Sequence, residues 1–167
     1  MATPRDRRLG FELERMKKVV LENPSISFIA QGGQPVEYGV ILRCRGIEAI
    51  DGDKKIYRDE HRLIIKLGPE FPLDAPLIYW ETPLFHPNVV PPAVCMGDHW
   101  YPGGSVAELC LALCEMVQYR SFNIYDPLNR DAAQWIEKRI EIGDSISVDK
   151  ADNADETNFE LNPVQRS

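Results

Sequence analysis

The sequence has no apolar run long enough to cross a membrane. A spanning helix needs roughly 18 or more mostly apolar residues, and no stretch of this 167-residue chain approaches that length. The N-terminal residues also lack the apolar segment of a secretory signal. We therefore expect a soluble, cytoplasmic protein with no membrane partner.

Basic charge and cysteine are scarce as well. Lys and Arg number 19 against 26 Asp and Glu, which makes the net charge -7. Because nucleic-acid binding depends on clustered Lys and Arg that contact phosphates, this balance argues against a nucleic-acid partner. The four cysteines are irregularly spaced, which indicates free thiols in a reducing compartment rather than a disulfide framework.

Length and composition indicate one globular domain followed by a tail. A chain of 167 residues with 44% hydrophobic content can bury the core of one domain. Apolar periodicity ends near residue 143, so we assign residues 1–143 to that domain. Residues 144–167 carry mostly Asp, Glu, Asn and Ser without periodicity, which predicts an acidic, disordered C-terminal tail.

The first half of the chain predicts one helix and a sheet. The helix begins at Thr3-Pro4, carries an apolar stripe at spacings of three and four residues, and ends at Asn23-Pro24. Strand-like segments follow at residues 25–30, 36–44, 62–67 and 77–80. Because short turns join strands of this kind, they favour a four-stranded antiparallel meander.

The second half is predicted to be helical. Ser105 and Glu108 form a capping box for one helix. Its inward positions are Val106, Leu109, Cys110, Leu113 and Val117. A further helix is expected over residues 129–142, stopped by Gly143, with these positions inward: Ala132, Ala133, Ile136 and Ile140. The pattern as a whole predicts an α+β fold with an N-terminal helix, a four-stranded antiparallel sheet and C-terminal helices.

One short stretch has the residues for acyl chemistry. His86-Pro87-Asn88 is followed, seven residues after Asn88, by Cys95. A thiolate can attack and carry an acyl group, and an Asn side chain can stabilise the oxyanion that forms in the transfer. Taken alone, a cysteine between Val94 and Met96 also fits an inert core thiol.

This stretch resembles the signature of the ubiquitin-conjugating enzymes, or E2s, in which a His-Pro-Asn turn lies just upstream of the active cysteine. Phe71-Pro72-Leu73-Asp74-Ala75-Pro76 resembles the family's aromatic-Pro-x-x-x-Pro loop. Trp100 and Pro102 resemble its Trp-x-Pro, and Asp126-Pro127-Leu128-Asn129 resembles the segment before its next helix. The similarity covers roughly residues 5 to 142 and implies the E2 fold.

The resemblance implies a cysteine thioester relay. Cys95 would accept ubiquitin or a ubiquitin-like modifier from an E1 activating enzyme and pass it to a lysine amine or another thiol. Asn88 would stabilise the oxyanion or support the nearby loop, His86 would hold the turn, and Asp126 would position the acceptor lysine. Asn in a turn and Asp before a helix are also common structural residues, so both assignments keep a structural alternative. No cofactor or metal is implied, because the E1 uses the ATP.

The resemblance also suggests partner surfaces. Arg7 and Arg8 lie where E2s contact the E1, and Leu73 and Pro102 lie in the two loops that commonly meet a RING-type E3. The basic residues of this region, which include Arg5, equally fit a solvated helix start.

Several departures from the family pattern indicate a divergent and compact relative. Fewer residues separate Cys95 from Trp100 than in typical eukaryotic E2s, and the usual Tyr-x-Gly-Gly turn is missing between Ile47 and Arg62. No clear fourth helix follows the third. These departures leave open a prokaryotic origin and a modifier other than ubiquitin.

Two other interpretations compete with an enzyme. Cys95, His99, Cys110 and Cys114 are soft ligands that could in principle hold zinc. However, the last two fall on or beside the apolar face of the capped helix, where cysteine behaves as a small hydrophobic residue. The chain could also be a non-catalytic E2-like module that binds a modifier or serves as a scaffold. The presence of the candidate catalytic residues favours an enzyme.

Overall fold

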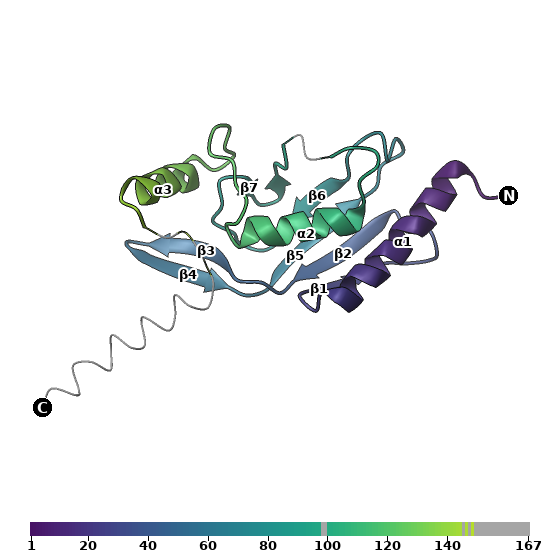
Figure 1. The fold of residues 1–167 in the computed structure, drawn as a ribbon, viewed down its shortest axis with the longest axis horizontal. Coiled ribbons are helices and arrows are strands. Elements are labelled where there is room, and N and C mark those ends of the chain that lie inside the picture. The colour runs from purple at the N-terminus through teal and green to yellow at the C-terminus, as the bar shows by residue number, and fades with distance from the viewer. Residues whose placement is uncertain (98–99, 145, 147, 149–167) are drawn as a thin grey trace, which may run out of the picture.

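The computed structural model describes residues 1–97, 100–144, 146 and 148 (Figure 1). The elements follow in this order: α1 (Pro4–Glu22), β1 (Ile26–Ile29), β2 (Glu37–Leu42), β3 (Gly46–Asp51), β4 (Lys54–Arg58), β5 (His61–Lys66), β6 (Leu77–Trp80), β7 (Val89–Val90), β8 (Ala93–Val94), α2 (Val106–Val117) and α3 (Arg130–Glu141). No helix in the described part is long and apolar enough to cross a membrane.

The predicted antiparallel meander is confirmed. The main sheet has the order β1-β2-β5-β6, with Val40 opposite Leu63 and Leu63 opposite Trp80. The pattern does not predict the β3–β4 hairpin between β2 and β5, because its strands show little apolar alternation. The two-residue turn of that hairpin is Gly52-Asp53, with Gly52 at a φ of 61°, and this Gly-Asp pair is its best sequence signal.

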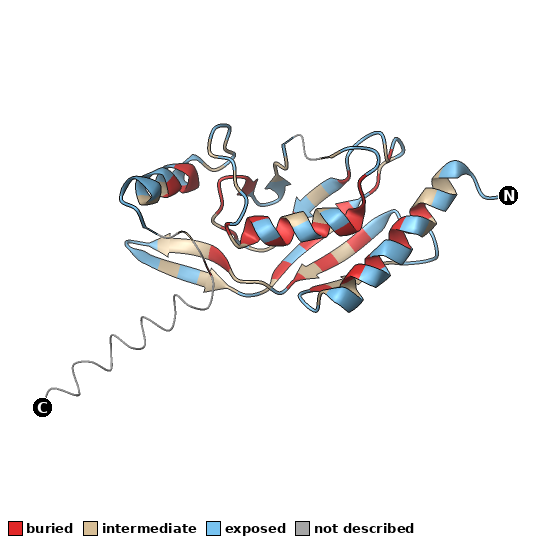
Figure 2. Ribbon diagram, in the orientation of Figure 1, coloured by how far each residue is buried: buried red, intermediate tan, exposed pale blue. Residues whose placement is uncertain are grey.

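The N-terminal helix begins and ends where its sequence predicts. Thr3 Oγ1 accepts a hydrogen bond from the Asp6 N–H at 3.0 Å, and the Asp6 carboxylate accepts one from the Thr3 N–H at 2.8 Å. Both bonds lower the pKa of Asp6. The helix then ends before Asn23, and its apolar stripe faces the core (Figure 2).

The second helix crosses over the main sheet (Figure 1). Its predicted capping box is confirmed: Ser105 Oγ accepts from the Glu108 N–H at 3.1 Å. Four of its predicted inward positions are buried, and Leu109 is half-buried at the edge of the core. Cys110 and Cys114 are buried in the same core, and burial raises the pKa of Cys110. The described residues contain no group of three His, Cys, Asp or Glu side chains placed to hold a metal, and His99 lies outside them.

A second, smaller core joins α3 to the β3–β4 hairpin, at the end of the molecule away from α1 (Figure 1). Ile136 is fully buried there, but the predicted inward position of Ile140 is wrong, since its side chain is 53% exposed. The last turn of α3 lies beyond this core. The side chain of Arg139, in place of Ile140, packs at the edge of this smaller core, with its guanidinium 5.2 Å from the centre of the Trp135 ring.

The predicted C-terminal tail lies mostly outside the described residues. Within residues 144–167, Val148 is described and is buried in the smaller core. Gly143 has a φ of 71°, a conformation that glycine adopts most readily, and it follows the end of α3 as predicted.

Candidate active site

A tight turn positions the residues that precede the cysteine. His86 is fully buried, and its Nδ1 accepts a hydrogen bond from the Asn88 N–H at 3.0 Å. Burial lowers the pKa of His86 to about 3. A buried, neutral imidazole that accepts a backbone hydrogen bond holds the turn and is not placed to take a proton from solvent-facing groups.

The cysteine itself follows a short hairpin on the edge of the main sheet. The Trp80 N–H of β6 donates to the Pro92 carbonyl at 3.0 Å, which ties the β7–β8 hairpin to the sheet. The Cys95 N–H donates to the Asn88 carbonyl at 2.9 Å. These two bonds fix Cys95 relative to both the sheet and the turn, and leave its side chain half-buried.

The side chain of Asn88 joins this turn to a segment more than thirty residues later. Its Nδ2 donates to the Asn123 carbonyl at 2.8 Å, and its Oδ1 accepts from the Asn123 N–H at 2.9 Å. The amide is therefore held at both ends. Because an amide nitrogen carries two N–H groups, one donor remains beyond the bond to Asn123.

The backbone of the turn also binds the later segment, at the end of that segment which leads into α3. The Pro87 carbonyl accepts from the N–H groups of Leu128 and Asn129 at 2.8 and 3.0 Å. Asp126 lies in the sequence between Asn123 and Leu128, the two places where the turn binds this segment, and is exposed. The helix-capping alternative for Asp126 does not hold, since Asn129 caps α3 by accepting from the Ala132 N–H at 3.0 Å.

These segments surround an open cleft of about 850 Å³. Cys95, Asn88 and Asp126 all line it, although they are separated by up to 38 positions in the sequence. The remaining walls come from residues 100–105, from α2 and from residues 121–123. The three residues predicted for the chemistry are thus brought to one cleft. His86, which is predicted to hold the turn, is not among the residues that line the cleft and binds the Asn88 N–H.

The predicted partner residues divide into two kinds. Arg7, Leu73 and Pro102 are exposed, with Leu73 at 73%. Arg8 is different, because its guanidinium contacts Glu12 and the Pro102 carbonyl within the chain. The N-terminal arginines therefore do not form one uniform basic surface.

The motifs do not predict Asn123 as a residue of the site. They do not predict the burial of Glu12 either, although Glu12 belongs to the pattern Arg7-Arg8-Leu9 with Glu12-Leu13 that resembles the first helix of E2s. Asn123 contributes only its backbone groups to the bonds with Asn88, so no side-chain pattern marks it. Glu12 is fully buried. It lies three residues after Leu9 and four before Met16, within the apolar stripe, and a carboxylate at such a position is a signal that the sequence does carry.

Comparison with known proteins gives the family. The fold and cleft define an α+β domain that presents a cysteine on a groove. Residues 48–143, more than half of the chain, match the family model described as ubiquitin-conjugating enzyme, and the chain belongs to this family.

Two curated relatives agree with this assignment. The chain is 33% identical over 79 residues to ubiquitin-conjugating enzyme E2 16 of Schizosaccharomyces pombe, which covers 44% of the chain and 48% of that protein. It is 31% identical over 80 residues to SUMO-conjugating enzyme UBC9 of Caenorhabditis elegans, which covers 44% and 47%. The chain thus spans about half the length of the curated relatives it matches.

Proposed function

We propose that the chain is an E2 enzyme that carries ubiquitin or a ubiquitin-like modifier as a thioester on Cys95. The observation that supports this most strongly is the meeting of Cys95, Asn88 and Asp126 on one cleft in a chain of the ubiquitin-conjugating family. The two relatives are named for different modifiers, ubiquitin and SUMO, so the modifier is the first thing to test.

The proposed chemistry has two acyl transfers. In the first, the Cys95 thiolate attacks the thioester carbonyl on the E1, a new carbon–sulfur bond forms, and the E1 thiolate leaves. In the second, a lysine amine or another thiol attacks the Cys95 thioester, and the Cys95 thiolate leaves. Because one thioester replaces another in the first step, orientation of the two partners can supply most of the rate.

Asn88 is proposed to stabilise the oxyanion of both tetrahedral intermediates. Its amide is held by Asn123 and keeps one N–H donor for this purpose. A donor that is fixed before the reaction stabilises developing charge without reorganising, and the loss of one such donor typically costs about 10²- to 10³-fold in rate. The same bonds let Asn88 support the segment that carries Asp126.

Asp126 is proposed to position the acceptor lysine. Its carboxylate is exposed on the cleft, where it can hold an ammonium group near Cys95 and take up the proton released on attack. An amine held in place in this way would react faster at a given lysine concentration.

The proposed partners are the modifier, an E1 and a RING-type E3. Arg7, on α1, would face the E1, and Leu73 and Pro102 would face the E3, since all three are exposed. ATP would be consumed by the E1, so the chain itself needs no cofactor. We propose a cytoplasmic location for the reaction.

A charging assay tests this proposal. The chain is mixed with ATP and either ubiquitin or SUMO, each with its own E1, and resolved on gels with and without thiol reductant. We expect one modifier to add to the wild type in a reductant-sensitive form. Cys95→Ala should abolish the adduct, and Cys95→Ser should give an oxyester that resists reductant.

Cys44→Ala is the matched control, because Cys44 is also half-buried but lies two residues beyond the end of β2, outside the residues lining the cleft. It should charge like the wild type. If neither modifier charges the wild type, or if Cys95→Ala still charges, the relay through Cys95 is wrong and a modifier-binding module becomes the better account.

A further inference from the structure

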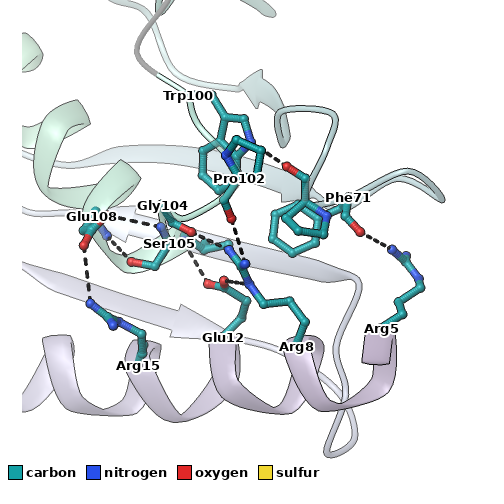
Figure 3. Close-up of polar contacts among 12 residues, drawn as sticks. Arg5, Arg8, Glu12, Arg15, Phe71, Trp100, Pro102, Gly104, Ser105 and Glu108 are labelled. Carbon is teal, nitrogen blue, oxygen red and sulfur yellow. Dashed lines mark hydrogen bonds and ion pairs between the residues drawn. The ribbon is translucent and has the colours of Figure 1, made fainter. Parts of the chain in front are cut away.

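An ion pair on α1, between half-buried Arg8 and buried Glu12, contacts the residues that precede α2 (Figure 3). Glu12 is fully buried, and its Oε1 lies 2.7 Å from the Nε of Arg8. A carboxylate loses much free energy when it leaves water, so a buried one is kept only with charged or hydrogen-bonding partners. The other hydrogen bonds of Arg8 and Glu12 show which parts of the chain this pair holds in place.

Arg8 binds the loop of residues 100–105, which we call the 100–105 loop. Its Nη1 donates to the Pro102 carbonyl at 2.8 Å, and its Nη2 donates to the Gly104 carbonyl. The guanidinium also lies over the Phe71 ring, 5.2 Å from the ring centre. The planar fork of an arginine suits these several contacts, which a lysine ammonium cannot make together.

The loop is held on its other side by Trp100. Its Nε1 donates to the Pro72 carbonyl at 2.9 Å, and its ring packs on Phe71 with centres 5.6 Å apart (Figure 3). Trp100, Tyr101 and Gly104 line the cleft that also holds Cys95. Arg8 therefore contacts the back of a loop whose front is a wall of the candidate active site.

Glu12 extends the same connection to α2. Its Oε2 accepts from the Val106 N–H, the first residue of α2, at 2.8 Å. The first amides of a helix lack partners within the helix, and a negative charge at that end is favourable. Because α2 forms another wall of the cleft, the pair joins α1 to two of its walls.

We propose that Arg8 and Glu12 are positioning residues for the thioester chemistry at Cys95. They hold the 100–105 loop and the start of α2 in the arrangement that orients the modifier's C-terminal segment and the acceptor. This assignment rests on the proposed function. It removes Arg8 from the E1-docking surface, because three of its nitrogens are bonded within the chain and its side chain is only 22% exposed. Arg7, which is exposed, keeps the docking role.

The test compares Arg8→Lys with a matched control, Arg15→Lys. Arg15 lies on the same helix and also pairs with α2, at 3.3 Å from Glu108, but both side chains are largely exposed, at 43% and 49%. Exposed ion pairs contribute little to stability. The same substitution therefore changes a half-buried guanidinium paired with a buried carboxylate in one variant, and a solvated ion pair in the other. Glu12→Gln serves as a second variant, since it keeps the size of the side chain and one oxygen acceptor.

Two measurements are made on each full-length variant. The first is transfer: the chain is charged with whichever of ubiquitin or SUMO loads the wild type, and its discharge to free lysine is followed after the E1 is stopped. The second is hydrogen–deuterium exchange of the amides in residues 100–106, which needs no activity. Exchange in β2 and β5 and the thermal midpoint report whether the rest of the fold is intact.

We expect Arg8→Lys to slow discharge at saturating lysine by about tenfold, because small misplacements of reacting groups are costly. The E1 concentration for half-maximal charging should not change. Exchange in residues 100–106 should rise in Arg8→Lys and Glu12→Gln, with β2 and β5 unchanged, and Arg15→Lys should match the wild type in every respect.

Three outcomes overturn the proposal. Unchanged exchange in residues 100–106 in both variants means that the pair does not hold the loop. Normal discharge combined with a greater need for E1 returns Arg8 to docking. Arg15→Lys behaving like Arg8→Lys removes any special role of the buried pair. If the wild type does not charge at all, the proposed function fails separately, and exchange alone decides whether Arg8 and Glu12 position the loop.

Discussion

Replacing Asn88 by alanine should separate two effects of one side chain. The change removes both bonds to Asn123 and the second N–H donor of the amide, which these bonds leave over. Each bond contributes about 0.5–1.5 kcal/mol to stability. Because Asn123 is exposed and water can replace the lost partner, we expect a stability loss near the lower end, about 1 kcal/mol for the two.

The effect on rate should be larger than the effect on stability. Loss of one oxyanion donor costs about 10²- to 10³-fold, or roughly 3–4 kcal/mol of transition-state stabilisation. The assay is single-turnover discharge of the Cys95 thioester to lysine at saturating concentration, with urea unfolding measured on the same samples. We expect the rate to fall by about 10²-fold while the chain stays folded.

A double-mutant cycle with Asp126→Ala tells the two roles apart. If Asn88 acts as an oxyanion donor, its loss should cost about the same factor whether or not Asp126 is present. If Asn88 acts only by supporting the segment that carries Asp126, its replacement in Asp126→Ala should change the rate by less than about twofold. The second result would refute the oxyanion assignment and leave Asn88 a structural residue.

Three further predictions concern stability. Burial lowers the pKa of His86 from 6.5 to about 3, so the unfolded chain takes up this proton at a higher pH than the folded chain does. Between about pH 6.5 and 3 the contribution of His86 should lower the free energy of unfolding by about 1.4 kcal/mol per pH unit as the pH falls, measured by urea titration at pH 7.5 and 5. Ile136→Ala should cost about 2–5 kcal/mol and Ile140→Ala well under half of that, because only Ile136 is buried; equal losses in calorimetry would contradict the position of α3. Gly52→Ala should cost about 1 kcal/mol through its positive φ, seen as a lower thermal midpoint with an unchanged charging rate.

The elements that are predictable from the sequence are those with local causes. The first helix is marked by Thr3-Pro4 and an apolar stripe, and α2 by the Ser105–Glu108 capping box, and both are found where the pattern predicts them. The β3–β4 hairpin has no such marking apart from its Gly52-Asp53 turn. Ile140 has the right spacing to face inward, but spacing alone does not tell where the neighbouring core ends.

The same distinction applies to the candidate site. The motif predicts which residue types carry the chemistry, and the fold brings Cys95, Asn88 and Asp126 to one cleft. It does not predict that Asn88 binds the backbone of Asn123, or that Arg8 binds carbonyls of the 100–105 loop. Backbone partners distant in sequence leave no trace in residue types, so only the structure shows them.

The most direct test of the central claim is intact mass spectrometry of the charged chain. After incubation with ATP, a modifier and its E1, the mass should rise by one modifier less one water and return to its starting value with thiol reductant. Alkylation of the denatured chain before reduction should then mark the other cysteines, two of which are buried in the folded chain, and leave Cys95 protected. A thioester on a different cysteine, or a Cys95 that is fully alkylated in the charged species, would contradict the account.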